Sequence, residues 1–112
     1  MFKDPITAGL SALWLVLPAT AVNFLRAWDR LPVRMATHFD AQWQPNGWSS
    51  REDAMILAFT IITFVLVMVT GACLLVRKTK PDHAWPCLVI SGPVVLFVAW
   101  FTNLLISHNL PS

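Results

Sequence analysis

Charged residues are scarce in this chain. Asp, Glu, Lys and Arg make up 12% of its 112 residues, whereas a soluble domain carries about 25%. Hydrophobic residues make up 56%, so a water-soluble fold would lack enough polar side chains to cover its surface. The net charge of +2 comes from basic residues spread along the chain. No basic patch therefore points to nucleic-acid binding.

Cysteine is also rare, and the usual signatures of catalysis are missing. Cys73 and Cys87 are too few for a disulfide framework. We interpret them as small apolar side chains inside helices, with a metal or redox pair as the alternative. The sequence contains no nucleophile–base set, no phosphate-binding glycine loop and no zinc-ligand spacing. We therefore expect a non-enzymatic protein without a cofactor.

What the chain does have is three long runs without charge, at 6–25, 54–76 and 84–107. Each is long enough to cross a hydrocarbon core of about 30 Å as a helix. The predicted fold class is an all-α integral membrane protein, in which one domain holds three transmembrane helices. A short irregular or extended loop at 26–53 and a basic turn at 77–83 would join them. The absence of Asp, Glu, Lys and Arg from these spans argues against a proton relay, ion pump or voltage sensor.

The first run resembles a secretory signal peptide, with Lys3 before an apolar stretch and a cleavage-like site at Ala19-Thr20-Ala21. The apolar character continues to Leu25, so we expect the segment to be retained as a span. Pro18 is expected to kink this helix. Asn23 either bonds to another helix or, more simply, is hydrated at the membrane interface.

Two local signals concern the second and third runs: one predicts a helix start and the other a bend. Ser49 with Glu52, and Ser50 with Asp53, both fit a capping box, which predicts a helix start within two residues of Ser50. In the third run, Gly92-Pro93 predicts a bend.

Basic residues give a weak prediction of topology. Four of them, Lys3, Arg77, Lys78 and Lys80, fall on one side of the predicted membrane, and four others, Arg26, Arg30, Arg34 and Arg51, fall on the other. The first set lies closer to the spans, so we predict a multi-pass protein of the bacterial inner membrane. Its N-terminus would be cytoplasmic and its 26–53 loop extracytoplasmic. Trp28, Trp43, Trp48 and Trp85, together with Arg77, Lys78 and Lys80, are expected at the membrane interface.

The 26–53 loop carries the densest pattern. Leu31-Pro32 ends any helix that leaves the membrane, and residues 34–39 alternate in polarity as an extended segment does. Pro45-Asn46-Gly47 predicts a turn, because proline presets φ and Asn and Gly tolerate positive φ.

The order and spacing of ten loop residues resemble the bacterial membrane family named domain of unknown function 1648. These residues are Leu31, Pro32, His38, Phe39, Pro45, Asn46, Gly47, Trp48, Ser50 and Arg51. The resemblance implies a multi-span inner-membrane protein related to the N-terminal part of immunity proteins that protect bacteria from a secreted killing peptide. Trp43 stands where the family pattern has glycine, and tryptophan cannot cheaply adopt positive φ.

His38 is the sharpest functional candidate. We expect it to hydrogen-bond the turn and fix the loop; recognition of a ligand or partner is the alternative. His38, Asp40 and His108 form a weak candidate metal set. Arg51 is expected to extend along the interface or to pair with Asp40.

The leading functional hypothesis is a small accessory subunit or partner-recognition protein acting through the 26–53 loop. Its expected partners are membrane lipids and either other membrane subunits or further copies of itself, with no nucleic acid. The alternatives are an immunity or envelope-stress sensing protein and, less favoured, a membrane enzyme or metal site that uses His38.

Overall fold

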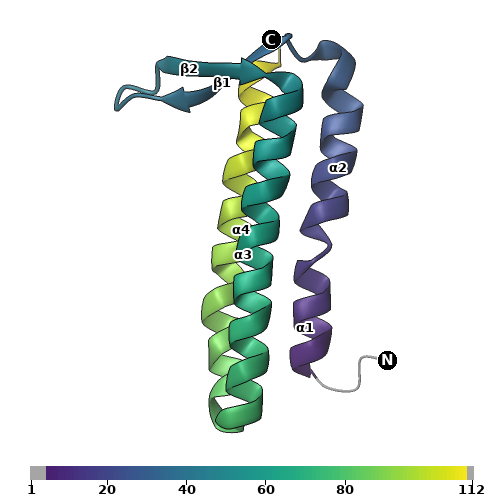
Figure 1. Cartoon of the computed structure of the whole chain (residues 1–112), viewed down its shortest axis with the longest axis vertical. Coiled ribbons are helices and arrows are strands. Elements are labelled where there is room, and N and C mark those ends of the chain that lie inside the picture. Colours follow the sequence, from purple (N-terminus) through teal and green to yellow (C-terminus); the bar gives the residue numbers. More distant parts are fainter. Residues whose placement is uncertain (1–4, 111–112) are drawn as a thin grey trace.

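The computed structural model describes residues 5–110, so Lys3 lies outside the described residues. The elements follow in the order α1 (Pro5–Leu13), α2 (Val16–Ala27), η1 (Trp28–Arg30), β1 (Arg34–Phe39), β2 (Pro45–Ser50), α3 (Arg51–Thr79), η2 (Pro81–His83) and α4 (Ala84–Asn109). The long helices α3 and α4 run side by side, and α1 and α2 follow one another along them (Figure 1). The β1–β2 hairpin projects sideways at the end opposite η2 (Figure 1).

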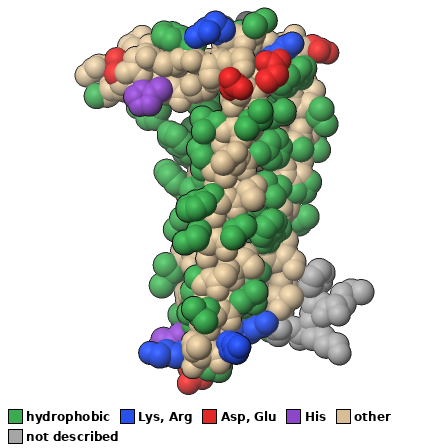
Figure 2. Space-filling view, in the orientation of Figure 1, with side chains coloured by type: hydrophobic (Ala, Val, Ile, Leu, Met, Phe, Trp, Pro, Cys, Tyr) green, Lys and Arg blue, Asp and Glu red, His purple; other side chains and the backbone are tan. Residues whose placement is uncertain are grey.

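Three helical segments are long and apolar enough to cross a membrane: Pro5–Arg30, Arg51–Thr79 and Pro81–Asn109. Hydrophobic side chains cover the length of the bundle, and most charged side chains gather at its two ends (Figure 2). The 29 residues of α3 rise about 43 Å at 1.5 Å per residue. This exceeds a hydrocarbon core of about 30 Å, so its ends reach the headgroup regions. The chain is a multi-pass membrane protein.

The loop contains a two-stranded sheet, which corrects the all-α prediction. The extended segment predicted at 34–39 is β1, but the turn predicted at Pro45-Asn46-Gly47 is wrong, because these residues begin β2. The chain reverses at residues 40–44 instead. There the Asp40 carboxylate accepts hydrogen bonds from the N–H groups of Gln42 and Gln44, both at 2.9 Å, an Asx arrangement that replaces a proline-led turn.

The first span is interrupted one turn before Pro18 rather than at it: α1 ends at Leu13 and α2 begins at Val16. Proline offers no N–H to the carbonyl four residues earlier, that of Trp14, and its ring crowds that carbonyl. The Leu17 N–H donates to it instead, at 3.2 Å. The indole Nε1 of Trp14 donates to Thr70 Oγ1 at 2.9 Å and so fixes the interruption against α3.

Asn23 bonds to another helix. Its Nδ2 donates to Asn103 Oδ1 on α4 at 2.9 Å, and Asn103 Nδ2 donates to Thr20 Oγ1 at 3.0 Å. Side-chain amides bonded between helices stabilise packing in lipid, where water cannot replace the partner. This network fixes α2 against α4.

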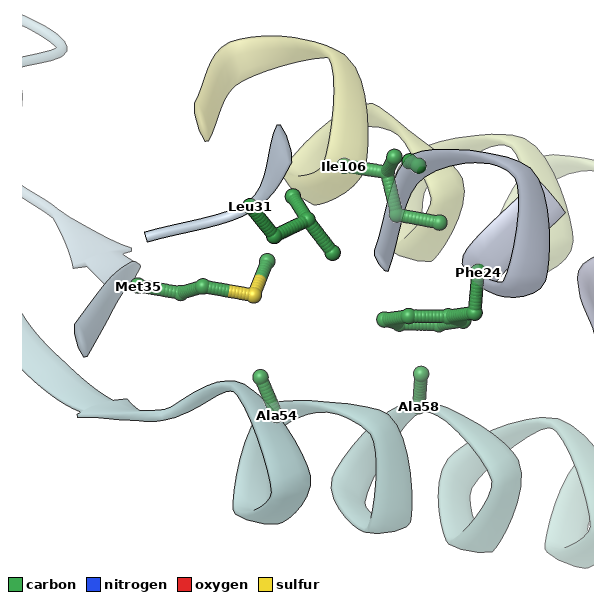
Figure 3. Packing of buried hydrophobic residues seen from close by; sticks show 7 residues of the cluster. Phe24, Leu31, Met35, Ala54, Ala58 and Ile106 are labelled. Carbon is green, nitrogen blue, oxygen red and sulfur yellow. The ribbon is translucent and has the colours of Figure 1, made fainter. Parts of the chain in front are cut away.

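A buried cluster at the hairpin end draws residues from the helices, from the linker and from β1: Phe24, Ala27, Leu31, Met35, Ala54, Ala58 and Ile106. Met35 is fully buried. Figure 3 shows the side chains of Met35 and Phe24 lying over Ala54 and Ala58, whose small size leaves room for them. The hairpin is thus part of the core rather than a free loop.

The start of α3 falls in the predicted window. The helix begins at Arg51, and the Ser50 hydroxyl accepts a hydrogen bond from the Asp53 N–H at 3.0 Å, which satisfies a free N-terminal donor. At the other predicted bend, α4 continues through Pro93 as one helix.

Candidate functional site

The hairpin contains two compensating bulges, and the motif residues His38, Asn46 and Gly47 lie at or beside them. Ala36 faces Trp48, His38 faces Gly47 and Phe39 faces Pro45. The register therefore skips Thr37 on β1 and Asn46 on β2. Bulges twist and bend a strand locally. Here they bring His38 and Asn46 together.

His38 makes its hydrogen bond within the hairpin. Its Nδ1 donates to Asn46 Oδ1, so its partner is a strand side chain. Gly47 lies directly opposite: a Cβ added there would stand 2.9 Å from His38 Cβ, closer than carbon atoms pack. His38, Asn46 and Gly47 therefore act together to set the bulged pairing.

Arg51 connects the start of the loop to the start of α3. Its guanidinium lies over the Trp28 ring, 4.8 Å from the centroid, and Nη1 donates to the Trp28 carbonyl at 3.0 Å. Its Nε is 3.5 Å from Glu52 Oε1. The predicted pairing with Asp40 is wrong, because Asp40 is engaged in the hairpin turn.

Asn109 is a site residue that the sequence analysis missed. Its Oδ1 accepts from the Ala36 N–H at 2.8 Å, and its Nδ2 donates to the Ala36 carbonyl at 3.0 Å. Nδ2 also donates to the Leu105 carbonyl at 2.7 Å. The last turn of α4 thus binds β1 through both backbone groups of one residue.

These bonds close one edge of the hairpin and leave the other open. The Arg51 N–H donates to the Val33 carbonyl at 3.0 Å, so alternation makes Met35–Ser49 a hydrogen-bonded pair and Ala36–Trp48 a non-hydrogen-bonded one. The backbone groups of Ala36 and Trp48 then point away from the partner strand. Asn109 hydrogen-bonds the outward N–H and C=O of Ala36. Within residues 5–110 the sheet has two strands, so no third strand bonds the outward N–H and C=O of Trp48.

The candidate metal residues are used separately. Asp40 supports the hairpin turn, and the ring of His108 packs edge-on against Phe39, with centroids 4.7 Å apart. His38 bonds Asn46. In the described part of the chain, no three His, Cys, Asp or Glu side chains lie together as a metal site requires.

The expected interface residues fall at the two ends of the bundle. Trp28 is half-buried at the hairpin end, where Trp43 and Trp48 are 64% and 51% exposed. Trp43 holds a φ of 60°, the positive value that glycine adopts more readily. At the opposite end lie Trp85, 54% exposed, and the basic residues Arg77, Lys78 and Lys80.

The spans and the anchored hairpin define a multi-pass membrane protein with a small sheet between its first two spans. Residues 14–64 match the family model described as Domain of unknown function (DUF1648), and this segment belongs to that family. The match runs from the interruption of the first span, through the hairpin, into the first half of α3. No curated protein and no solved structure gave a significant match.

Proposed function

We propose that this is a small, non-enzymatic membrane protein that recognises a polypeptide partner through its 26–53 loop, as an accessory subunit or recognition module. The observation that carries the proposal is the open outer edge of β2 at Trp48, on a hairpin anchored to the helices by Met35 and Asn109.

An open strand edge offers N–H and C=O groups to an added strand. Extended peptides bind in this way, and side-chain contacts then provide specificity. The exposed indole of Trp48 lies at the edge where such contacts form, and aromatic side chains contribute strongly to interfaces. Because the hairpin is anchored, little ordering would accompany binding, which favours affinity.

We further propose that the protein lies in the bacterial inner membrane with its N-terminus in the cytoplasm and the hairpin outside. The hairpin end also carries four arginines, but they are spread over a longer loop. The support is that Arg77, Lys78 and Lys80 lie in a short connection within a few residues of the spans, since short cytoplasmic loops are enriched in Lys and Arg.

The test is purification of the full chain in mild detergent, followed by identification and quantification of co-purifying proteins. A stoichiometric set of larger membrane subunits supports the accessory role. A lone homo-oligomer contradicts it.

Two variants at Trp48 separate backbone from side-chain recognition. Trp48→Pro removes the indole together with an outward N–H, whose loss edge strands tolerate, whereas Trp48→Ala removes the indole and keeps the N–H. Strand addition predicts that the proline variant retains less partner than the alanine variant. Equal retention by Trp48→Pro and the unmodified chain excludes strand addition. Ser49→Pro, which removes a ladder bond, serves as the control for hairpin disruption.

A second candidate is immunity or envelope-stress sensing, in which the same edge would bind a secreted peptide. It rests on the resemblance of the loop motif to the family that includes immunity proteins against a secreted killing peptide. Deleting the gene and challenging cells with secreted peptides tests this candidate, and unchanged survival counts against it.

A membrane enzyme or metal site using His38 has less support, because His38 Nδ1 already donates to Asn46. Such a site predicts that His38→Ala abolishes activity at an unchanged protein level. Loss of the protein from the membrane would show instead that His38 is structural.

A further inference from the structure

The tip of the hairpin overhangs a hollow on the side of the helical bundle. Two adjoining recesses of about 460 and 470 Å³ share four lining residues, Phe39, Trp43, Phe101 and Leu105. We call them together the hairpin niche. The hairpin forms its roof, and α3 and α4 form its wall, as the overhang in Figure 2 shows. Each recess falls in the range of small-molecule sites, roughly 300–1,000 Å³.

The niche lies at the depth where acyl chains begin. Phe101 precedes the last residue of α4, Asn109, by about 12 Å along the helix. The ends of these helices extend past a hydrocarbon core of about 30 Å by only a few ångströms on each side. The wall at Phe101 and Leu105 therefore stands in hydrocarbon, while the roof stands at headgroup level.

Most of the lining surface is apolar, and its described residues include no Lys or Arg. Leu57, Ile61, Leu104 and Val98 complete the wall. The polar lining residues are Thr37, His38 and Asp40 on the hairpin side and Thr102, Ser107 and His108 on α4. The Asp40 carboxylate already accepts hydrogen bonds from two N–H groups of the hairpin turn. Without Lys or Arg, a lipid phosphate finds no permanently positive partner there.

We propose that the hairpin niche binds one acyl chain of a membrane phospholipid, beneath the Phe39–Trp43 roof. The acyl chain fills the space beneath the hairpin, which ordinary surrounding lipid cannot reach. The headgroup remains outside the niche. The niche recognises the acyl chain rather than the headgroup, so zwitterionic and anionic phospholipids bind alike. This proposal is independent of the partner proposed for the β2 edge.

Tryptophan quenching in vesicles tests the proposal. The full chain is reconstituted in phosphatidylcholine brominated high on the acyl chain, and the Trp43 and Trp48 contributions are obtained by difference from Trp43→Phe and Trp48→Phe. Both indoles belong to the same hairpin and are exposed, but only Trp43 lines the niche. We expect Trp43 to be quenched at least twofold more than Trp48.

Ser107 provides a matched pair for occupancy, because it is exposed and lines the niche. Ser107→Phe should roughly halve the quenching of Trp43 by filling the space, and Ser107→Ala should leave it unchanged. Brominated phosphatidylglycerol should quench Trp43 as strongly as brominated phosphatidylcholine.

Three outcomes would overturn the proposal. Equal quenching of the two indoles means that only ordinary surrounding lipid is present. Strong quenching of Trp43 by aqueous iodide means that water fills the niche. A clear preference for one headgroup means that charge, rather than the chain, is recognised.

Discussion

The two ends of the bundle are built differently. At the hairpin end, segments far apart in sequence meet: the Asn109 amide bonds Ala36, and Met35 is buried against α2, α3 and α4. At the opposite end the short η2 turn joins α3 to α4, and α1 covers the junction. The hairpin end is thus built from tertiary contacts that hold a projecting sheet in place, whereas the η2 end mainly connects two helices.

The η2 end is held by smaller contacts. The thiols of Cys73 and Cys87 are free, with their Sγ atoms 3.4 Å apart, and Cys73 belongs to a small cluster with Ile6 and Leu10. Arg77 Nη1 donates to Thr7 Oγ1 at 2.8 Å. These contacts pair neighbouring helices without building a projecting element.

The largest effect is expected at Met35. Met35→Ala empties a fully buried position and should lower the free energy of unfolding by about 2–5 kcal/mol. The measurement is denaturant unfolding in detergent micelles. The control is Met68→Ala, since Met68 is 58% exposed on α3, and its effect should stay within about 0.5 kcal/mol. Similar losses in both variants would contradict the burial of Met35 in the core of the hairpin end.

Gly47→Ala should have the next largest effect. The added Cβ meets His38 Cβ at 2.9 Å, so the strands must separate, at a cost of about 1–3 kcal/mol. Gly71→Ala is the matched control, because nothing lies within 4 Å of its added Cβ. Unfolding in micelles, followed by the fluorescence of Trp48, reports the hairpin. An unchanged midpoint for Gly47→Ala would contradict the bulged register.

Asn109→Ala should release β1 with a loss of stability in the same range as that of Gly47→Ala. It removes two bonds to Ala36, and the expected loss is about 1–3 kcal/mol because the Ala36 groups are left unpaired. Hydrogen exchange of the Ala36 amide measures it directly. Asn109→Asp retains the acceptor for this amide, so protection should fall less than in Asn109→Ala. Equal exchange in all three proteins would mean that Asn109 does not hold the strand.

Thr7→Val should have the smallest effect. It removes one acceptor of the charged Arg77 guanidinium while preserving shape and the positive charge. A hydrogen bond to a charged group contributes about 1.5–3 kcal/mol, and Arg77 is only half-buried, so the loss should not exceed the low end of that range. The same unfolding measurement applies. A loss as large as that of Met35→Ala would show that the η2 end is as tightly built as the hairpin end.

Sequence patterns predicted the helices well because composition and capping are local signals. The runs at 54–76 and 84–107 lie inside α3 and α4, and Ser50 caps α3 as its spacing with Asp53 indicated. The extended segment at 34–39 was also correct. The interruption before Pro18 was displaced by one turn, because proline acts on the carbonyl four residues earlier.

The site was less predictable because its contacts are not local. The turn at 40–44 depends on two bonds to one Asp40 oxygen and on a positive φ at Trp43, which composition alone argued against. The partner of Ala36 lies 73 residues away at Asn109. No pattern within the 26–53 loop indicates that residue.

The bond between Ala36 and Asn109 has a consequence for biogenesis. The ribosome synthesises β1 long before the last turn of α4. The nascent hairpin therefore lacks its hydrogen bonds to Asn109 while α4 is still being made. Docking of the sheet is completed only after the third helix has been inserted. Arrest of synthesis after α3 would therefore yield an intermediate whose Ala36 amide exchanges freely, with both strand edges accessible to chaperones or proteases.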